Sequence, residues 1–256
     1  MKTKLLVILL LGISASTGAQ ASLIDRGSGL LYDNVLDVTW LQDANYAKSS
    51  GYDADGMMTW TAAKTWAADL VYGGYSDWRL ASNSPINGSS FNDSYAINGS
   101  TDFSYNITSP LSELAYMYSV NLNLKSFFDT TGYIRNDFGV FGNGTNNGID
   151  SSSFGQKNVG LVNNLQNEEY WSDSETAPGS DNAWYFGTYA GYQHYNAKYI
   201  QFYAWAVSPG DVASASASAS AVPVPGAFWL FISALAGLMG IKRRGGIGCF
   251  CAFEGA

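Results

Sequence analysis

Cysteine is nearly absent from this chain of 256 residues, which has only Cys249 and Cys251, close to its C-terminus. Disulfide bonds are therefore excluded within residues 1–248. The Cys-x-Cys pair supplies too few ligands for a structural zinc site. A domain formed by the rest of the chain is long enough to bury a core without cross-links.

Histidine and catalytic motifs are also scarce. The single histidine is His194, in the polar and aromatic run 192–195. The chain has no Gly-x-Ser-x-Gly, His-Glu-x-x-His, Gly-x-Gly-x-x-Gly or phosphate-loop motif. Catalytic triads are defined by geometry, so His194 stays open as a catalytic residue or an exposed sheet residue. We expect that the protein is not an enzyme.

Positive charge is low in the middle of the chain. Five of the 13 basic residues and one of the 21 acidic residues lie outside 22–222, which leaves eight basic and 20 acidic residues and a net charge of −12. Such a segment repels phosphate backbones, so no nucleic-acid partner is expected. The acidic charge either attracts cations or keeps the protein soluble.

The N-terminus has the three parts of a secretory signal peptide. Lys2 and Lys4 precede the short apolar run 5–13, and a small-x-small cleavage site stands at 19–21. We predict a signal peptide at 1–21 with cleavage after Ala21. The alternative is a buried N-terminal helix.

The C-terminus has the pattern of a tether and a membrane anchor. Residues 213–221 alternate serine and alanine, which predicts a flexible linker. The apolar run 227–241 follows and predicts one transmembrane helix, although it is short for a bilayer. Basic residues follow this run. They predict that the preceding domain, residues 22–212 (the body), lies outside the cytoplasm. The alternative is a buried core helix.

Three short motifs follow one another in this tail. They are Val222, Pro223, Val224 and Pro225, then Trp229 and Leu230 in the apolar run, then Lys242, Arg243 and Arg244. With these residues the tail closely resembles the PEP-CTERM sorting signal in its Val-Pro-x-Pro variant. The resemblance covers 222–244 and implies that an exosortase-type enzyme sorts the protein to the cell surface or beyond. Residues 245–256, a short cytoplasmic tail, depart from the family because such tails usually end soon after the basic cluster.

Residues 22–212 read as one α+β domain. Apolar spacing predicts helices at 59–70 and 109–120, the second with Ser109 as N-cap and Pro110 as its first residue. Long Asn/Gly/Ser loops are expected at 83–106 and 142–155, and loops of that length are usually functional or disordered. Strands are predicted at 30–32, 39–41, 78–80, 170–172, 184–188 and 203–207.

Six short segments of 30–212 form an ordered set. They are Leu-Asp-Val-Thr-Trp-Leu at 36–41, Trp-Thr-Ala-Ala at 60–63, Gly-Tyr-Ser-Asp-Trp-Arg-Leu at 74–80, Ser-Glu-Leu at 112–114, Tyr-Trp-Ser at 170–172, and Ala-Trp at 183–184 followed by Ala-Trp-Ala-Val at 204–207. Together they resemble the Lcl C-terminal domain family, over nearly all of 30–212. The resemblance implies a C-type-lectin-like fold, with two helices on small twisted antiparallel sheets and long loops. Ala81-Ser82 departs from the family's usual Pro-Thr.

A C-type-lectin-like fold would not by itself imply that this protein has the activities known for that fold. Formylglycine-generating enzymes, which share it, need a cysteine pair that residues 22–222 lack. Sugar-binding C-type lectins use Glu-Pro-Asn or Gln-Pro-Asp with Trp-Asn-Asp, and none of these strings occurs here.

Three groups of residues are candidate sites. Arg79 is expected to be a half-buried or buried charge with carboxylate or carbonyl partners, or else a ligand residue. Asp53 and Asp55, in Asp-Ala-Asp-Gly, predict either a small calcium site or a solvated turn, and an EF-hand is excluded because the later Glu is missing. The third group is formed by four tyrosines of one aromatic segment, Tyr185, Tyr189, Tyr192 and Tyr195. They predict either a binding surface or a plain antiparallel sheet with aromatic cross-strand pairs.

Two functions compete on these observations. We favour an exported binding or structural protein, anchored in the membrane and then sorted to the surface or matrix, where polysaccharide or another surface polymer is its expected partner. The alternative is a secreted hydrolase of unknown substrate, whose acid and base carboxylates the sequence does not identify.

Overall fold

A computed structural model describes residues 23–140 and 156–213. These residues belong to one compact unit that ends at Ala213. The predicted signal peptide, the loop at 142–155, the sorting motif and the apolar run all lie outside the described residues, as does the linker except for Ala213. Within the described ranges, no helix is both long and apolar enough to cross a bilayer.

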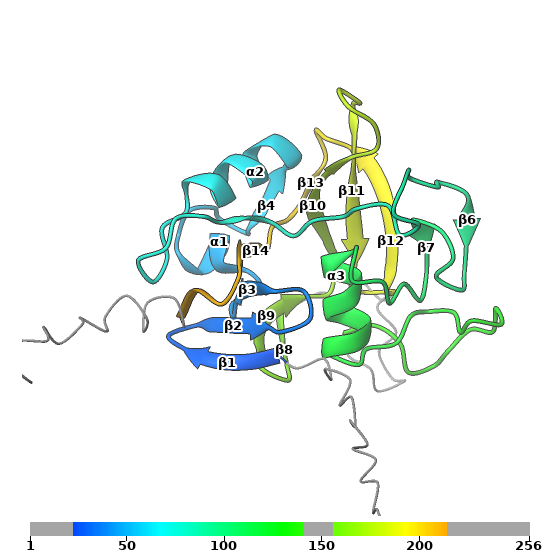
Figure 1. The fold of residues 1–256 in the computed structure, drawn as a ribbon, viewed down its shortest axis with the longest axis horizontal. Coiled ribbons are helices and arrows are strands. Elements are labelled where there is room, and N and C mark those ends of the chain that lie inside the picture. The colour runs from blue at the N-terminus through cyan, green and yellow to red at the C-terminus, as the bar shows by residue number, and fades with distance from the viewer. Residues whose placement is uncertain (1–22, 141–155, 214–256) are drawn as a thin grey trace, which may run out of the picture. The chain divides into compact units, whose positions relative to one another are not determined.

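Two five-stranded sheets form most of the domain, which is α+β as predicted (Figure 1). All pairings within them are antiparallel except β10 with β13. The first sheet has the order β1 (Leu23–Gly27), β2 (Leu30–Asp33), β3 (Val38–Leu41), β14 (Ala206–Pro209), β5 (Arg79–Leu80). The second sheet has the order β12 (Tyr192–Ala197), β11 (Asn182–Gly187), β10 (Glu169–Glu175), β13 (Gln201–Tyr203), β4 (Met57–Thr59).

Smaller elements surround these sheets. The helical elements are α1 (Tyr46–Ser49), α2 (Trp60–Asp69), α3 (Glu113–Tyr116) and the π-helix η1 (Met117–Asn121). The short strands are β6 (Tyr95–Ala96) and β7 (Phe103–Ser104), which pair in parallel, and β8 (Gln156–Val159) and β9 (Val162–Gln166), which form a hairpin. Figure 1 shows β6 and β7 beyond the β12 edge of the second sheet.

The helix predicted at 59–70 is confirmed as α2. Thr59 is its N-cap, and the threonine hydroxyl accepts a hydrogen bond from the Ala62 N–H, which satisfies one of the free donors at the helix start. The side chains of Trp60, Ala63 and Ala67 are buried, as the 3–4 spacing predicted. The helix therefore packs by the face that the sequence indicated.

The helix predicted at 109–120 begins four residues later than expected. α3 starts at Glu113 after the N-cap Ser112, and it continues directly into η1. The prediction of Ser109 as N-cap is wrong because its hydroxyl accepts instead from the Leu111 N–H, two residues on. This local turn ends before the helix begins.

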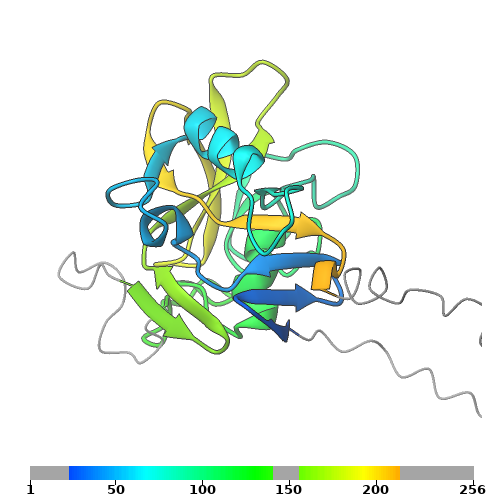
Figure 2. The same ribbon diagram turned by 90° about the vertical axis from the view of Figure 1, so that its left-hand side faces the viewer.

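The strand predicted at 203–207 is wrong, because the chain leaves one sheet there and enters the other. β13 ends at Tyr203 in the second sheet and β14 begins at Ala206 in the first. Figure 2 shows β14, in orange, beside the blue N-terminal strands. Trp205 lies at the crossing, 2% exposed, and its Nε1 donates to the Leu41 carbonyl oxygen at 2.7 Å. The crossing is therefore part of the core.

The long loop expected at 83–106 is ordered around one buried carboxylate. Asp102 is 0% exposed, and its two oxygens accept from the Ile86 N–H at 2.9 Å and the Asn92 N–H at 2.8 Å. Gly99 has a φ of +77°, and a Cβ added there would lie 2.4 Å from the Asn106 carbonyl oxygen. The backbone of this loop passes too close to itself for a side chain at 99.

We predict that Gly99→Ala lowers the free energy of unfolding by about 3 kcal/mol, because it adds a backbone clash to the strain of a positive φ. Gly88→Ala is the matched control, with φ +73° and nothing within 4 Å of the added Cβ. It should cost about 1 kcal/mol. Urea unfolding measures both, and equal losses would contradict the close approach at Gly99.

Candidate functional site

An open cleft of about 550 Å³ lies between α2 and the β10–β11 hairpin. Its volume is within the range of small-molecule and cofactor sites. Apolar and charged side chains both line it. The cleft is lined by Trp60, Lys64, Phe91, Asp173, Glu175, Thr176, Ala177 and Pro178.

The first wall is the start of α2. The Trp60 side chain is almost buried, and its Nε1 donates to the Ser172 carbonyl oxygen at 2.8 Å, which fixes the indole against β10. The ammonium groups of Lys64 and Lys198 each lie 4.5 Å from the Trp60 ring centroid. Cation–π attraction of this kind holds both lysines beside the cleft.

Phe91, in the loop that is held by the Asp102 carboxylate, also lines the cleft. The Phe91 ring lies 5.0 Å from the ring of buried Trp184, at an interplanar angle of 35°. The next residue, Asn92, is tied to the Asp102 carboxylate through its backbone N–H. Phe91 is therefore a half-buried aromatic side chain on a fixed backbone, which suits contact with an apolar ligand face.

Two carboxylates of β10, those of Asp173 and Glu175, line the cleft, and their pKa values are shifted in opposite directions. Burial raises the pKa of Asp173, although Ser174, whose hydroxyl donates to Oδ1 at 2.7 Å, opposes this. The ammonium of Lys198 lowers the pKa of Glu175, whose oxygens accept from that lysine and from the Gly179 N–H. Among the described residues, Asp173 accepts a side-chain hydrogen bond only at Oδ1, whereas both oxygens of Glu175 are engaged and anchor the hairpin turn.

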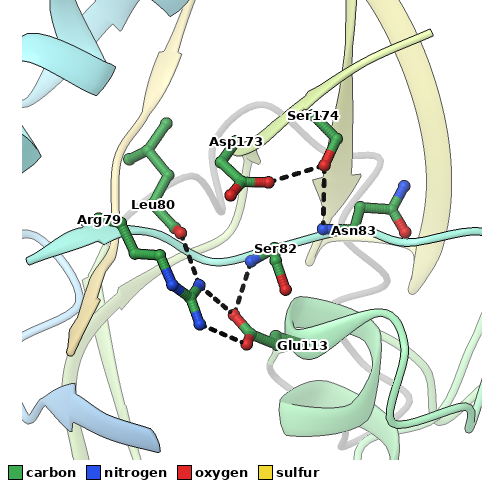
Figure 3. Close-up of polar contacts among 7 residues, drawn as sticks. All are labelled: Arg79, Leu80, Ser82, Asn83, Glu113, Asp173 and Ser174. Carbon is green, nitrogen blue, oxygen red and sulfur yellow. Dashed lines mark hydrogen bonds and ion pairs between the residues drawn. The ribbon is translucent and has the colours of Figure 1, made fainter. Parts of the chain in front are cut away.

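Arg79 of β5 forms an ion pair with Glu113 at the start of α3 (Figure 3). Nη1 and Nη2 of Arg79 each donate to one Glu113 oxygen at 2.8 Å, and Nη1 also donates to the Leu80 carbonyl oxygen at 3.0 Å. The expectation of carboxylate and carbonyl partners for Arg79 is confirmed. The Ser82 N–H adds a third donor to Glu113, at 2.6 Å.

The same segment joins the first sheet to the second. The Asp173 N–H donates to the Ala81 carbonyl oxygen at 3.0 Å, and the Asn83 N–H donates to the Ser174 hydroxyl at 3.3 Å (Figure 3). Residues 79–83 therefore connect β5, α3 and β10, and they fix the position of Asp173 in the cleft.

We predict that Glu113→Gln lowers the free energy of unfolding by about 2 kcal/mol, because it leaves the Arg79 guanidinium half-buried without its carboxylate. Lys125→Met is the matched control, since it breaks the ion pair to Asp137, whose two side chains are 48% and 43% exposed. Exposed pairs add little, so its midpoint in urea should stay almost unchanged. Similar losses in both variants would argue against a structural role for the Arg79 pair.

Three of the four tyrosines predicted as a binding surface come together. The Tyr192 hydroxyl is hydrogen-bonded to the hydroxyls of Tyr189 and, at 3.1 Å, Tyr185. Tyr195 pairs instead with Trp184 on the neighbouring strand, with ring centroids 5.3 Å apart. Tyr185 is only 6% exposed, so its ring faces other side chains more than solvent. The tyrosine network remains a candidate binding surface at its Tyr189 and Tyr192 edge.

A carboxyl group adjoins this tyrosine network. Glu169 of β10 is in register with Gly187, which pairs in turn with Tyr192 on β12. Burial, and next the hydrogen bond with Glu168, raise the pKa of Glu169 to about 8, although a hydrogen bond with Tyr189 opposes them. Glu169 is therefore protonated at neutral pH in the folded protein.

We predict that the domain loses stability as the pH rises from about 5 to about 8. The folded pKa of Glu169 exceeds its ordinary value of 4.5, so its contribution is complete below pH 4.5, falls progressively above it and is lost once the pH has passed about 8. Glu169→Gln should remove this dependence of the urea midpoint on pH between about pH 5 and 8. Glu175→Gln, which replaces a carboxylate of lowered pKa, should keep the wild-type slope over that range. A flat wild-type profile would refute the assignment.

Asp53 and Asp55 shape a turn. Asp53 Oδ1 accepts from the backbone N–H groups of Asp55 and Gly56, and Asp55 Oδ1 accepts from the Met57 N–H at 2.9 Å. These N–H groups outweigh burial, so the pKa of Asp53 is lowered. Across residues 23–140 and 156–213, no three Asp, Glu, His or Cys side chains gather as a metal site would require.

His194 is half-buried, which corrects the expectation that it is exposed. The centroid of its ring lies 4.0 Å from that of Phe103 and 5.7 Å from that of Tyr185, whose ring is nearly parallel to it. Burial lowers the pKa of His194. Its Nδ1 contacts the backbone of Tyr195, and no carboxylate bonds to its ring among the described residues. The surroundings are those of an aromatic side chain in a sheet.

No family model, curated protein or solved structure matches the chain. The α2–β10 cleft was also not predicted from the sequence, although Arg79 beside it was. A usable signal was present in 169–175, where acidic residues stand at 169, 173 and 175 of one strand. The partners on α2 and in the loop come from distant positions, which the sequence alone does not bring together.

Proposed function

We propose that the protein is an exported, exosortase-sorted binding module at the cell surface or in the extracellular matrix. Its body lies outside the membrane, and its α2–β10 cleft binds a segment of polysaccharide. In this proposal the body is an Lcl-type, C-type-lectin-like domain without catalytic activity. The PEP-CTERM-like tail anchors it through a transmembrane helix until sorting.

The C-terminal tail and the signal peptide support the proposed location outside the cytoplasm. A signal peptide at 1–21 exports the body, and the basic cluster at 242–244 keeps the end of the apolar run on the cytoplasmic side. The alternating linker at 213–221 separates body and bilayer. An acidic body without cysteine is soluble and independent of the redox state outside the cell.

The single observation that carries the binding role is the composition of the cleft. Two aromatic side chains, Trp60 and Phe91, line the cleft together with Asp173. Flat apolar faces combined with a few fixed polar groups are typical of small-molecule sites. Sugars present both a flat C–H face and hydroxyl donors, which fit the aromatic walls and the carboxyl oxygen.

We predict that Phe91→Ser weakens retention of the protein by neutral polysaccharide at least tenfold, and that Lys64→Ser weakens it less. Affinity electrophoresis through gels with dissolved glucan or galactan measures this. Tyr52→Ser is the matched control, since Tyr52 is 58% exposed and does not line the cleft. Unchanged retention in Phe91→Ser, or no retention of the wild type on any matrix polymer, would favour a purely structural role.

A secreted hydrolase is the second candidate, because Asp173 and Glu175 share one cleft while their pKa values are driven in opposite directions. Such divergence is typical of acid and base pairs. The anchoring of both Glu175 oxygens makes this the weaker proposal. Release of reducing ends from a polysaccharide, abolished by Asp173→Asn, would establish it instead of the binding role.

Calcium at Asp53 and Asp55 would be a structural addition to this module. Millimolar calcium on a micromolar site stabilises a fold by about 4 kcal/mol. A melting temperature that does not change with chelator would remove calcium from the proposal.

A further inference from the structure

A second, polar pocket of about 340 Å³ lies on a different part of the domain. It opens between the loop at 98–108, the end of η1 and the segment 124–135. Amide, hydroxyl and cationic side chains dominate its walls. The lining residues are Asn98, Asn106, Thr108, Ser119, Leu124, Lys125, Ser126, Thr130 and Arg135.

Arg135 differs from the other two arginines of the described chain. Arg26 and Arg79 each donate through two nitrogens to a carboxylate, those of Asp211 and Glu113. Arg135 forms no ion pair within residues 23–140 and 156–213, and its Nε is buried without a hydrogen-bond partner there. A buried donor without an acceptor is uncommon in native proteins and needs an explanation.

The acid nearest in sequence to Arg135 is already engaged. Asp137 accepts from the Lys125 ammonium, and this contact is the main reason why the pKa of Asp137 is lowered. Arg135 contributes to that shift only through its more distant charge. As far as the described residues go, the Arg135 guanidinium is therefore the cation of the pocket lining that has no ion pair.

Three hydroxyl groups of the lining also have no bond within the described chain. Thr108, Ser119 and Thr130 all line the pocket, and their side chains form no hydrogen bond to other described residues. Hydroxyls both donate and accept, so they match the hydroxyls of a ligand.

The pocket walls are fixed by one asparagine. Asn106 Nδ2 donates to the carbonyl oxygens of Ile97, at 2.6 Å, and Phe128, at 3.0 Å. Its backbone N–H donates to the Ser126 hydroxyl at 3.1 Å, and that hydroxyl donates to the Gly191 carbonyl oxygen. The three segments around the pocket are therefore joined before any ligand binds, which reduces the cost of binding.

We infer that this pocket binds a small sugar acid, with the carboxylate on the Arg135 guanidinium and the ligand hydroxyls on Thr108, Ser119 and Thr130. A guanidinium fork matches a planar carboxylate with two parallel hydrogen bonds, as Arg79 and Glu113 do in this protein. The acidic body favours a ligand with a single negative charge over a polyanion. The inference does not depend on the α2–β10 cleft.

Saturation-transfer NMR on the full-length chain tests the inference, with D-galacturonate, D-galactose and inorganic sulfate as probes. We expect galacturonate to bind at least tenfold more tightly than galactose, and sulfate to compete weakly. Arg135→Gln should abolish the preference for the acid, and Arg135→Lys should retain only part of it because an ammonium lacks the fork. Arg26→Gln is the control and should bind as the wild type does.

Thr130→Val extends the test to the hydroxyls and covers a failure of Arg135→Gln to fold. It should weaken galacturonate binding while the preference over galactose remains. Equal binding of the two sugars, no binding of galacturonate by the wild type, or competition by sulfate at equal strength would overturn the inference. Loss of cleft binding in Phe91→Ser with galacturonate binding unchanged would separate the two sites.

Discussion

The two sheets of the body are coupled by the crossing of the chain from β13 to β14. Trp205 occupies this crossing, with its ring 4.7 Å from Trp40 of the first sheet and 6.0 Å from Tyr170 of the second. Its indole N–H is bonded to the Leu41 carbonyl, so the polar atom of a large buried side chain is satisfied. The position of each sheet therefore depends on the other, in a domain without disulfide bonds.

A second connection between the two sheets positions residues of the α2–β10 cleft. Residues 79–83 run from β5 to the second sheet, held by the Arg79–Glu113 pair and by backbone bonds to β10. Asp173 is placed by this connection, and the Trp60 indole by its bond to Ser172 on the same strand. The α2–β10 cleft is thus built partly on strand and helix positions, through Trp60 and Asp173, whereas Phe91 and residues 176–178 come from loops. Sites on such elements are held more accurately than sites on loops.

Much of the local structure could be predicted from the sequence. Helix α2 follows from the spacing of Trp60, Ala63 and Ala67 after a threonine cap, and the partners of Arg79 follow from the cost of burying a charge. The start of α3 could not be predicted, because Ser109 bonds locally in a way that imitates a cap. The sequence also did not indicate that 203–207 is divided between two sheets. The residues before and after the crossing are equally apolar, so composition does not mark the point where one strand ends and the next begins. The cleft depends on contacts between distant residues, such as the hydrogen bond from Trp60 to Ser172, 112 positions away, and no local sequence pattern indicates that contact.

Urea unfolding of the chain ended at Val212 tests most directly whether the two sheets form one cooperative unit. Unfolding would be followed by tryptophan fluorescence and by hydrogen exchange at amides of both sheets. We predict that this body folds without the tail and unfolds in one transition, with the protected amides of β2, β3, β10 and β11 exchanging together. A body that fails to fold, or two sheets that unfold at different urea concentrations, would contradict it.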